Sequence, residues 1–351
     1  MRKTAISLAV VGVVFLVAAG LLAFWITPQY IARLPGDSNT TRTYGGQIAV
    51  VVIPTALQQG DLAGAIKRRL PETVNRHVQV SQTSGNTALV KDTITATTSG
   101  QPVGAISSQY ALDRRSLEAT ASHPTDWTVT DAKGLTVSWP IGAKQQNYTG
   151  WVPFTETTTQ LKYVRQEQHG GVNTYVYQAT VPAAPIKNPQ VLAALPKALP
   201  VSVLQAAGSA GLVSASQLAS LAKLFPGAAQ IPLGYTYQAT TTYWVAPATG
   251  IVVDLSTSQK EMAGISLPNG KVVGLIPVLA DSFKYTPGSV QAAVNDANNG
   301  SNTINALGVT IPIIAAAAGL VLVVIAIILW IRGRERGTAA AARPPSTGAR
   351  V

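Results

Sequence analysis

Two long apolar segments at opposite ends of the chain limit the folds it can adopt. Ala5–Ile26 and Val309–Ile331 contain no Asp, Glu, Lys, Arg or His. An α-helix rises about 1.5 Å per residue, so each segment is long enough to cross a hydrocarbon core of about 30 Å. The sequence therefore predicts a membrane protein with a cytoplasmic stub and first spanning helix in residues 1–27, and a second spanning helix in residues 309–331.

The charges beside these segments predict how the chain is oriented. Seven basic residues and one acidic residue lie at the two chain ends, outside the apolar segments. Basic residues next to a span favour the cytoplasm, so both termini are expected there. Residues 28–308 then form an extracytoplasmic domain at the plasma membrane, and residues 332–351 form a basic, disordered cytoplasmic tail. A cleaved signal peptide is the alternative interpretation of the first segment, although its apolar stretch exceeds the usual length of about 7–15 residues.

The net charge does not indicate a nucleic-acid partner. The chain carries a formal charge of +11, and its two ends account for more than half of that excess. The domain between the spans is long enough to bury a substantial core. The chain has no cysteine, so this domain must fold without disulfide bonds.

A two-residue alternation of apolar and polar side chains dominates the segment between the spans, and it is typical of half-buried strands. The segments that follow it are Val78–Gln82, Ala88–Thr98, Leu135–Trp139, Gln160–Gln166, Thr174–Val181, Tyr235–Val245, Ile251–Thr257 and Lys271–Ile276. Glycines at 170 and 171 and the stretch Ala246–Gly250 indicate turns between neighbouring strands. The predicted fold is mainly β with added helices (α+β), as an antiparallel sheet or open barrel between the two transmembrane helices.

Three segments break this alternation and are expected to be helical. Gly60–Leu70 ends in basic residues that suit a helix C-terminus. Asn188–Phe225 is an apolar insertion rich in Ala and Leu, with internal prolines that interrupt or kink it. Gly288–Asn298 is expected to form a short helix that leads through a polar linker, Asn298–Thr303, into the second span.

The chain lacks the signatures of common enzymes. It contains no P-loop, no G-x-S-x-G elbow and no H-E-x-x-H zinc motif. His77, His123 and His169 are far apart in the sequence, without the spacing of metal ligands on one helix. We therefore expect a non-enzymatic protein with no metal and no cofactor.

Aromatic and apolar side chains are the remaining candidates for function. Aromatic residues on strands are usually core or cross-strand partners, but they can also line a groove for a glycolipid. The apolar insertion can likewise be a core helix pair or a mobile lid over a lipid cavity. The candidate lipid-binding residues are Leu192, Leu195, Leu199, Val203, Leu204, Leu218, Leu221, Phe225, Trp151, Tyr177 and Trp244.

Several short segments resemble a known family. They are Tyr148–Trp151, Gly171–Tyr175, Leu199–Leu204, Tyr243–Asp254 and Phe283–Thr286. Together with the layout of two anchors around a β-rich domain, they are similar to the actinobacterial two-pass envelope family known as PorA-family porins, which includes the polar growth factor PgfA. The resemblance covers essentially the full chain. Its matching segments are structural motifs that contain no catalytic signature.

The resemblance implies a role in cell-envelope biogenesis. It suggests binding or transfer of a membrane lipid or glycolipid, such as a mycolate glycolipid, at the outer face of the plasma membrane. A lipid exporter or other envelope proteins would then be partners, at growing poles. A scaffold for envelope-assembly or polar-growth proteins, without a bound ligand, is the alternative. Small residues suit the close helix packing that a scaffold needs, with Ala315 and Gly319 on one span and Gly12 and Gly20 on the other. A porin is less favoured, because two uncharged helices provide no aqueous path.

Overall fold

The structure is a computed structural model that describes residues 2–53, 56, 59, 61–209, 213–266 and 272–341. The chain divides into two compact units. One unit joins residues 1–33 to residues 299–351, and the other comprises Leu34–Asn298. This division separates the two apolar segments from most of the chain between them.

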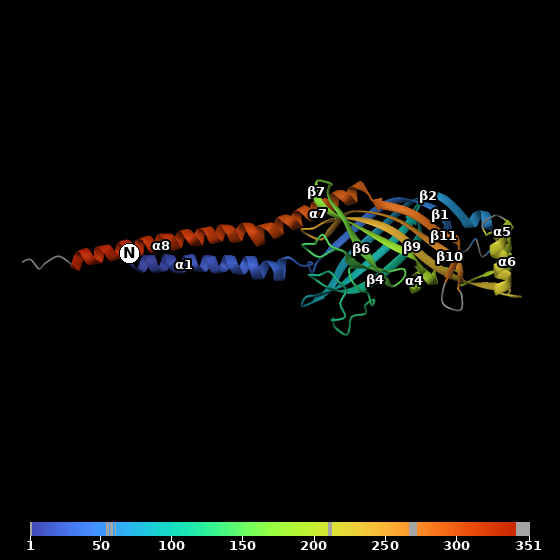
Figure 1. Cartoon of the computed structure of the whole chain (residues 1–351), viewed down its shortest axis with the longest axis horizontal. Coiled ribbons are helices and arrows are strands. Elements are labelled where there is room, and N and C mark those ends of the chain that lie inside the picture. Colours follow the sequence, from blue (N-terminus) through green and yellow to red (C-terminus); the bar gives the residue numbers. More distant parts are fainter. Residues whose placement is uncertain are drawn as a thin grey trace, which may run out of the picture. The chain divides into compact units, whose positions relative to one another are not determined.

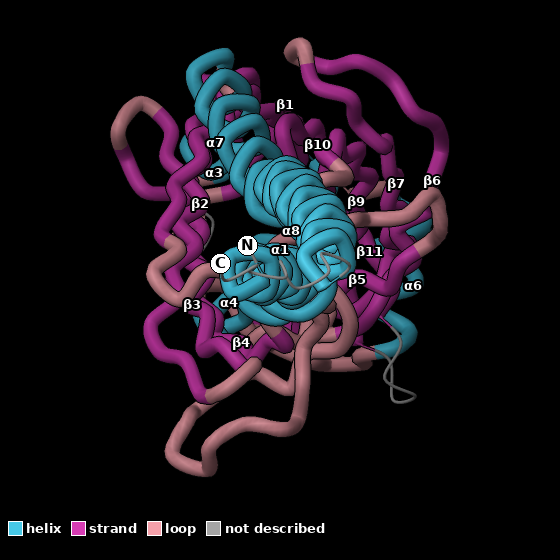
Figure 2. The backbone as a smooth tube through the Cα atoms, turned by 90° about the vertical axis from the view of Figure 1, so that its left-hand side faces the viewer, coloured by secondary structure: helices cyan, strands magenta, loops and turns pink. Residues whose placement is uncertain are grey.

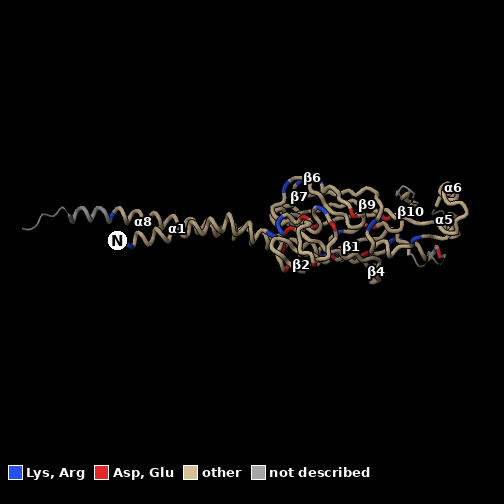
Figure 3. The backbone as a smooth tube through the Cα atoms, turned by 90° about the horizontal axis from the view of Figure 1, so that it is seen from below, with Lys and Arg blue, Asp and Glu red and all other residues tan. Residues whose placement is uncertain are grey.

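The first unit is built from two long apolar helices. Helix α1 (Arg2–Leu21) continues into a π-helix, η1 (Leu22–Ile31), and a second π-helix, η2 (Ala306–Thr310), leads into α8 (Ile311–Ala341). Both helices are long and apolar enough to cross a membrane. Figure 3 shows almost no charged positions along α1 and the described part of α8. The prediction of two candidate spans is confirmed, and α8 continues into the segment predicted as a disordered tail.

Small residues form the contact between these two helices. Ala5, Gly12 and Ala19 of α1 are buried at intervals of seven residues, as are Gly319 and Ala326 of α8. Gly12 lies against Gly319, and Ala5 lines a groove together with Ala326, so the helices run antiparallel. A seven-residue period keeps one face of each helix against its partner along the whole pair.

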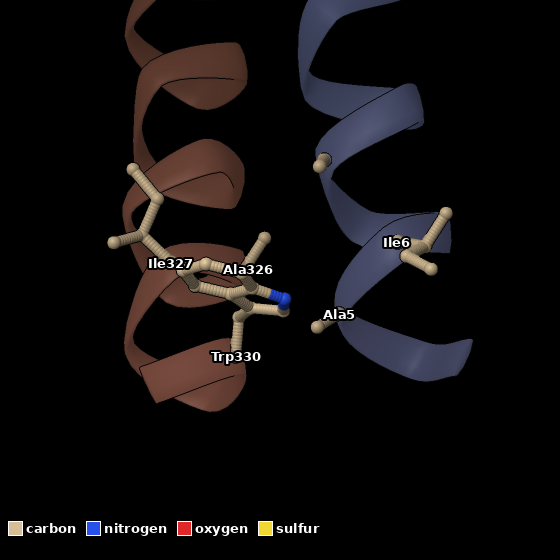
Figure 4. Close-up of a pocket in the computed structure, with 6 residues that line it drawn as sticks. Ala5, Ile6, Ala326, Ile327 and Trp330 are labelled. Carbon is tan, nitrogen blue, oxygen red and sulfur yellow. The ribbon is translucent and has the colours of Figure 1, made fainter. Parts of the chain in front are cut away.

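One end of the helix pair leaves a small apolar groove. Figure 4 shows the Trp330 ring of α8 extending toward Ala5 of α1, and Ile6 and Ile327 also line the groove. Its volume is about 150 Å³. Gly20, which the sequence placed on the packing face with Gly12, meets no atom within 4 Å. The predicted use of Gly12 and Gly319 in packing is therefore confirmed, whereas Gly20 takes no part in it.

The second unit is a strongly curved antiparallel sheet. Its described residues form eleven strands, ten of them in the order β4-β3-β2-β1-β11-β10-β9-β7-β6-β5, with β8 paired separately to β9. The strands are β1 (Asn39–Val52), β2 (Ile66–Ser84), β3 (Thr87–Thr98), β4 (Gln101–Asp113), β5 (Tyr148–Val152), β6 (Thr157–His169), β7 (Val172–Pro185), β8 (Ala198–Pro200), β9 (Gln230–Ala246), β10 (Ile251–Ser266) and β11 (Val272–Tyr285). Figure 2 shows them curving into an incomplete ring. The predicted antiparallel sheet or open barrel is confirmed as a half-barrel.

The two edge strands of the half-barrel, β4 and β5, are linked by the long connection between them. Isolated bridges pair Leu112 with Ala119, Glu118 with Leu135, and Leu135 with Gly150. The side-chain amide of Gln190 also covers the β4 edge, because it accepts from Ser107 N at 2.9 Å and donates to Ser107 O at 2.7 Å. These contacts satisfy edge groups that would otherwise remain open to another strand.

Helices cover both ends of the sheet. The described helices of this unit are α3 (Leu62–Ala65), α4 (Pro189–Ala193), α5 (Val201–Ser209), α6 (Ala215–Leu224) and α7 (Pro287–Asn305), whose last turns belong to the first unit. Figure 1 shows α5 and α6 at one end of the sheet and α7 at the opposite end. A Ser214–Gln217 capping box begins α6, and Asn188 caps α4. The predicted helical character of the 188–225 insertion is confirmed, with β8 inside it.

Three local predictions were wrong. Of the predicted helix Gly60–Leu70, only Leu62–Ala65 is an α-helix among the described residues, because the basic residues that follow pair with β1 as part of β2. Leu135–Trp139 is not a strand; its side chains fill the half-barrel, and only Leu135 forms bridges. Asn298–Thr303 is helical, since α7 runs on to Asn305. In the first two cases tertiary packing outweighed the local sequence pattern.

Candidate functional site

The interior of the half-barrel is the candidate site. Alternate residues of each strand face inward, so side chains from distant strands meet there. Tyr110 of β4 and Trp151 of β5 come from opposite edges of the sheet, yet they pack in one cluster with Val137 of the connecting segment. The 114–147 connection therefore enters the concave side and occupies part of it.

Trp139 is the centre of an aromatic group in this interior. Its ring lies 5.2 Å from that of Tyr177 and 5.0 Å from that of Tyr243, measured between centroids. Tyr177 in turn contacts Tyr148 at 5.7 Å and Tyr163 at 5.9 Å. The phenol of Tyr177 donates to the carbonyl of Lys144 at 2.6 Å, and burial raises its pKa. The concave face at this end is a continuous aromatic lining drawn from four strands and the long connection.

Two indole groups inside the half-barrel have no hydrogen-bond acceptor. Nε1 of Trp139 and Nε1 of Trp151 are buried without a partner, and so is the hydroxyl of Thr136. Buried indole N–H groups usually find a partner, since an unpaired donor costs about 1–3 kcal/mol. Trp127 and Trp244 follow that rule, donating to Gln82 and Glu167 respectively. The interior therefore offers free donors beside its aromatic rings.

A charge pair lies on the same inner face. The guanidinium of Arg76 binds Asp92 through two bonds of 2.9 and 2.7 Å, and it also donates to the carbonyl of Thr136 at 3.0 Å. Asp92 is buried, whereas Arg76 is partly exposed. This bidentate pair ties β2 and β3 to the 114–147 connection, and it neutralises the charge that a lone buried Asp92 would carry.

Three carboxyl groups, the carboxyl trio, occupy the inner face further along the sheet: Glu72 of β2, Glu261 of β10 and Asp281 of β11. Burial raises the pKa of Glu72 to about 8, that of Glu261 to about 7 and that of Asp281 to about 6. The charge of Asp281 raises the pKa of the other two further. Gln259 donates to Asp281 at 3.1 Å and accepts from the phenol of Tyr237 at 3.0 Å.

The outer face of the same strands is hollowed by a groove of about 500 Å³. Its walls are mostly small or polar outward-facing side chains, and Asp281 and Gln259 also contribute to its lining. It crosses β1, β11, β10, β9 and β7, and includes Ala49, Thr180, Thr240, Ser258, Lys260 and Ser282. At Asp281, therefore, only the sheet itself separates the outer groove from the interior.

The predicted lipid-binding residues are distributed over several clusters. Leu199, Val203, Leu204 and Leu221 are buried in one cluster at the α5–α6 end, against which Leu218 and Phe225 pack, while Leu192 and Leu195 pack against a second cluster. Tyr177 belongs to the aromatic group around Trp139, and Trp151 packs in the cluster around Tyr110. Trp244 packs against the cluster that contains α7 and donates to Glu167. The structure thus places Tyr177 beside Trp139, whereas Trp151 packs in the separate cluster around Tyr110, and the leucine set lies apart from both.

Some residues of the interior were not singled out by the sequence. Trp139 stood within a predicted strand, where a core role was expected. Glu261 follows Leu255 and precedes Ile265 in a two-residue alternation, so its inward direction was readable from the strand pattern. No local sequence pattern marked Glu72 or Asp281 as neighbours of Glu261, because the proximity of these residues depends on the order of the strands in the sheet. Among the residues that the structure describes, no group of three or more His, Cys, Asp or Glu side chains could hold a metal ion.

Comparisons with known proteins identify the family. No curated protein matches the chain. A solved structure of the acyl-CoA thioesterase II TesB2 from Mycobacterium marinum is 11% identical over 71% of this chain and 82% of that chain, with a TM-score of 0.13, and it supports no argument about fold or function. A family model described as Porin PorA matches residues 4–328. The chain therefore belongs to the PorA porin family.

Proposed function

We propose that this protein is a non-enzymatic, membrane-anchored component of the cell envelope whose half-barrel binds, or helps transfer, a lipid or glycolipid. Membership of the PorA family and two apolar helices support a place in a membrane. The basic residues at both chain ends support a cytoplasmic position for the termini and an external position for the half-barrel. A mycolate glycolipid, an exporter partner and growing poles remain the finer expectations from the family resemblance.

The observation that carries this proposal is the pair of unpaired indole donors inside the half-barrel, one of them, Trp139, within the aromatic group. Nε1 of Trp139 and Nε1 of Trp151 are buried without an acceptor. A carbonyl, an ester or a sugar hydroxyl of a glycolipid supplies acceptors, and its rings or chains suit the faces of Tyr177 and Tyr163.

The family name raises a pore as an alternative, and the outer face of the sheet argues for helices as the crossing elements. A transmembrane strand presents an apolar band to lipid. The outward positions of β9 and β10 are instead polar, and include Gln238, Thr240, Thr242, Ser256, Ser258 and Lys260. We therefore propose that α1 and α8, and not the half-barrel, cross the membrane.

A scaffold without ligand is the second candidate. It is favoured by the burial of Leu199, Val203 and Leu204 in a cluster with Ile231 and Ile265, because this packing is that of an ordinary core. On this view α5 and α6 close the end of the half-barrel permanently. The prediction that the 188–225 insertion is a lid stays a prediction.

The test is lipid retention by the full-length protein after purification in detergent. Trp139→Phe and Trp151→Phe keep an aromatic ring but remove the free N–H. We expect each to reduce co-purifying lipid, measured by mass spectrometry of an extract, several-fold more than Trp127→Phe does, although each of these large-to-small changes lowers the melting temperature. Trp127→Phe is the matched control, because its N–H is already satisfied by Gln82. Equal lipid retention in all three variants contradicts the proposed site, and no lipid on the wild type favours the scaffold.

A further inference from the structure

The carboxyl trio comes from β2, β11 and β10, and β1, which lies between β2 and β11, separates Glu72 from the other two. Ile48 of β1 pairs with Asp281 of β11, and the next inward position of β1, Gly46, pairs with Glu72 of β2. On the other side, Asp281 pairs with Gln259, which is two residues from Glu261 on β10. All three carboxyl groups therefore face the interior, and Asp281 lies diagonally from Glu72 on one side and diagonally from Glu261 on the other.

These groups are buried without a compensating cation. Glu72, Glu261 and Asp281 are 5%, 6% and 4% exposed. Oε2 of Glu72 and Oδ1 of Asp281 have no hydrogen-bond partner, and no ion pair is found for any of the three among the described residues. Arg76, on the same face of β2, is held by Asp92. A buried carboxylate without a partner is unfavourable, so the group takes up a proton instead.

The titratable groups that face the trio come from each surrounding strand. β2, β10 and β11 contribute the three acids, and β9 contributes Tyr237, whose pKa is raised by burial so that its phenol stays neutral. Asp281 is the only charged neighbour that acts on Glu72 and Glu261 among the described residues. Lys260 lines the groove on the outer face. Proton binding is therefore the means by which these buried carboxylates lose their negative charge.

The backbone is irregular next to the carboxyl trio. The β1–β11 pairing shifts register between Ile48 and Val50, and the β10–β11 pairing shifts between Glu261 and Met262. Arg69 of β2 adopts a φ of +53°, in the left-handed region that non-glycine residues rarely occupy. β-Bulges weaken the local ladder and are common beside functional groups. The outer groove also reaches Asp281 and Gln259, which brings solvent close to the trio.

We propose that Glu72, Glu261 and Asp281 form a proton-operated latch in the wall of the half-barrel. With protons bound, the three buried groups are neutral and do not repel one another, so the wall between β2 and β10 stays closed. When the protons leave, the negative charge of Asp281 repels those of Glu72 and Glu261 in a poorly solvated interior, and the irregular β1–β11 pairing opens. The raised pKa values of the trio, from about 6 to about 8, place this opening between those pH values.

The latch is tested by hydrogen exchange of the full-length protein in detergent between pH 5.5 and pH 9. Exchange rates are divided by the intrinsic rate at each pH, and peptides covering 44–52 and 276–285 report on the β1–β11 pairing. We expect their protection to fall at least tenfold as the pH rises, because one unit of pKa shift corresponds to a tenfold change in an equilibrium. A peptide covering 161–169 of β6 should keep its protection.

Variants decide whether the carboxyl groups cause this change. The triple variant Glu72→Gln, Glu261→Gln, Asp281→Asn should lose the pH dependence and stay protected at pH 9. The single variant Glu72→Gln, which keeps the shape of the side chain, should show a smaller fall than the wild type. Asp131→Asn, at an exposed acid of the long connection, is the control and should behave as the wild type. A pH-independent wild type, or a Glu72→Gln protein with the full wild-type response, overturns the proposal.

Discussion

Gly12 and Gly319 pack so closely that a Cβ atom built on either residue would lie 2.7 Å from the carbonyl oxygen of the other. Only glycine fits at both positions, because real Cβ atoms do not approach an oxygen this closely. The contact lies midway along the buried small residues of α1 and α8. It sets the spacing of the helix pair, as small residues do where membrane helices pack closely.

Replacing Gly12 with Leu should separate the two apolar helices. The chain has no cysteine, so a pair introduced at Thr27 and Gly308 reports on the helices without background. The Cβ of a residue at 308 would lie 3.7 Å from that of Thr27, which suits a disulfide bond. We expect efficient oxidation of this pair alone and a marked loss on adding Gly12→Leu. Adding Gly20→Leu, at a position open to its surroundings, should leave the yield unchanged; equal losses from both would contradict the packing role of Gly12.

Truncating Leu204 should destabilise the half-barrel. Leu204 is 4% exposed and packs with Leu199, Ile231 and Leu221. Leu→Ala changes at buried sites reduce the free energy of unfolding by about 2–5 kcal/mol. Chemical denaturation of the Leu204→Ala variant should show a loss in this range, whereas Leu224→Ala, at a side chain 54% exposed, should change it little. An unaffected stability together with lost lipid retention would instead support a lid.

The carboxyl trio should make stability depend on pH in a defined direction. An unfolded glutamate titrates near pH 4, whereas burial raises the pKa of Glu72 to about 8 in the folded state. The folded state therefore binds more protons between these values, and stability falls as the pH rises through them. Glu72→Gln should melt at a higher temperature than the wild type at pH 8.5, and the advantage should shrink toward pH 4.5. An advantage that is the same at both pH values would point to packing instead of ionisation.

Removing the side-chain amide of Gln190 should loosen the seam between the edge strands. Its two bonds to Ser107 occupy backbone groups on the β4 edge. Gln190→Leu keeps much of the volume but removes both bonds, so hydrogen exchange in the 101–113 peptide should become faster. A net loss of about 1–3 kcal/mol is expected for two such bonds. Gln205→Leu, at an exposed helical position, is the control, and an equal effect there would show that the seam is held by other contacts.

The sequence predicted those parts of the fold that depend on local patterns. The two apolar helices, the hairpin turn at Gly170–Gly171 and the turn between β9 and β10 follow from composition and glycine placement, and the structure contains them. It did not predict that Trp139 enters the half-barrel, because the 135–139 segment alternates as a strand does. The placement of this segment depends on the space between the edge strands β4 and β5, and no local sequence pattern describes that space.

The same limit applies to the candidate site. Trp151 and Tyr177 were singled out by residue type, and the structure places Tyr177 in the aromatic group around Trp139 and Trp151 in the cluster around Tyr110. The carboxyl trio was not found, because its three members are separated by up to about two hundred residues and meet only through the strand order β2-β1-β11-β10. Long-range strand pairing is the part of this fold that sequence periodicity leaves open.

Native mass spectrometry of the full-length protein, released from detergent under mild conditions, tests the central claim most directly. The chain alone has a mass of 36.5 kDa. The account predicts a second species, heavier by the mass of one lipid or glycolipid, that diminishes in Trp139→Phe and Trp151→Phe and persists in Trp127→Phe. A single species at the mass of the chain, obtained from protein purified out of its own membrane, would contradict the claim that the half-barrel binds a lipid.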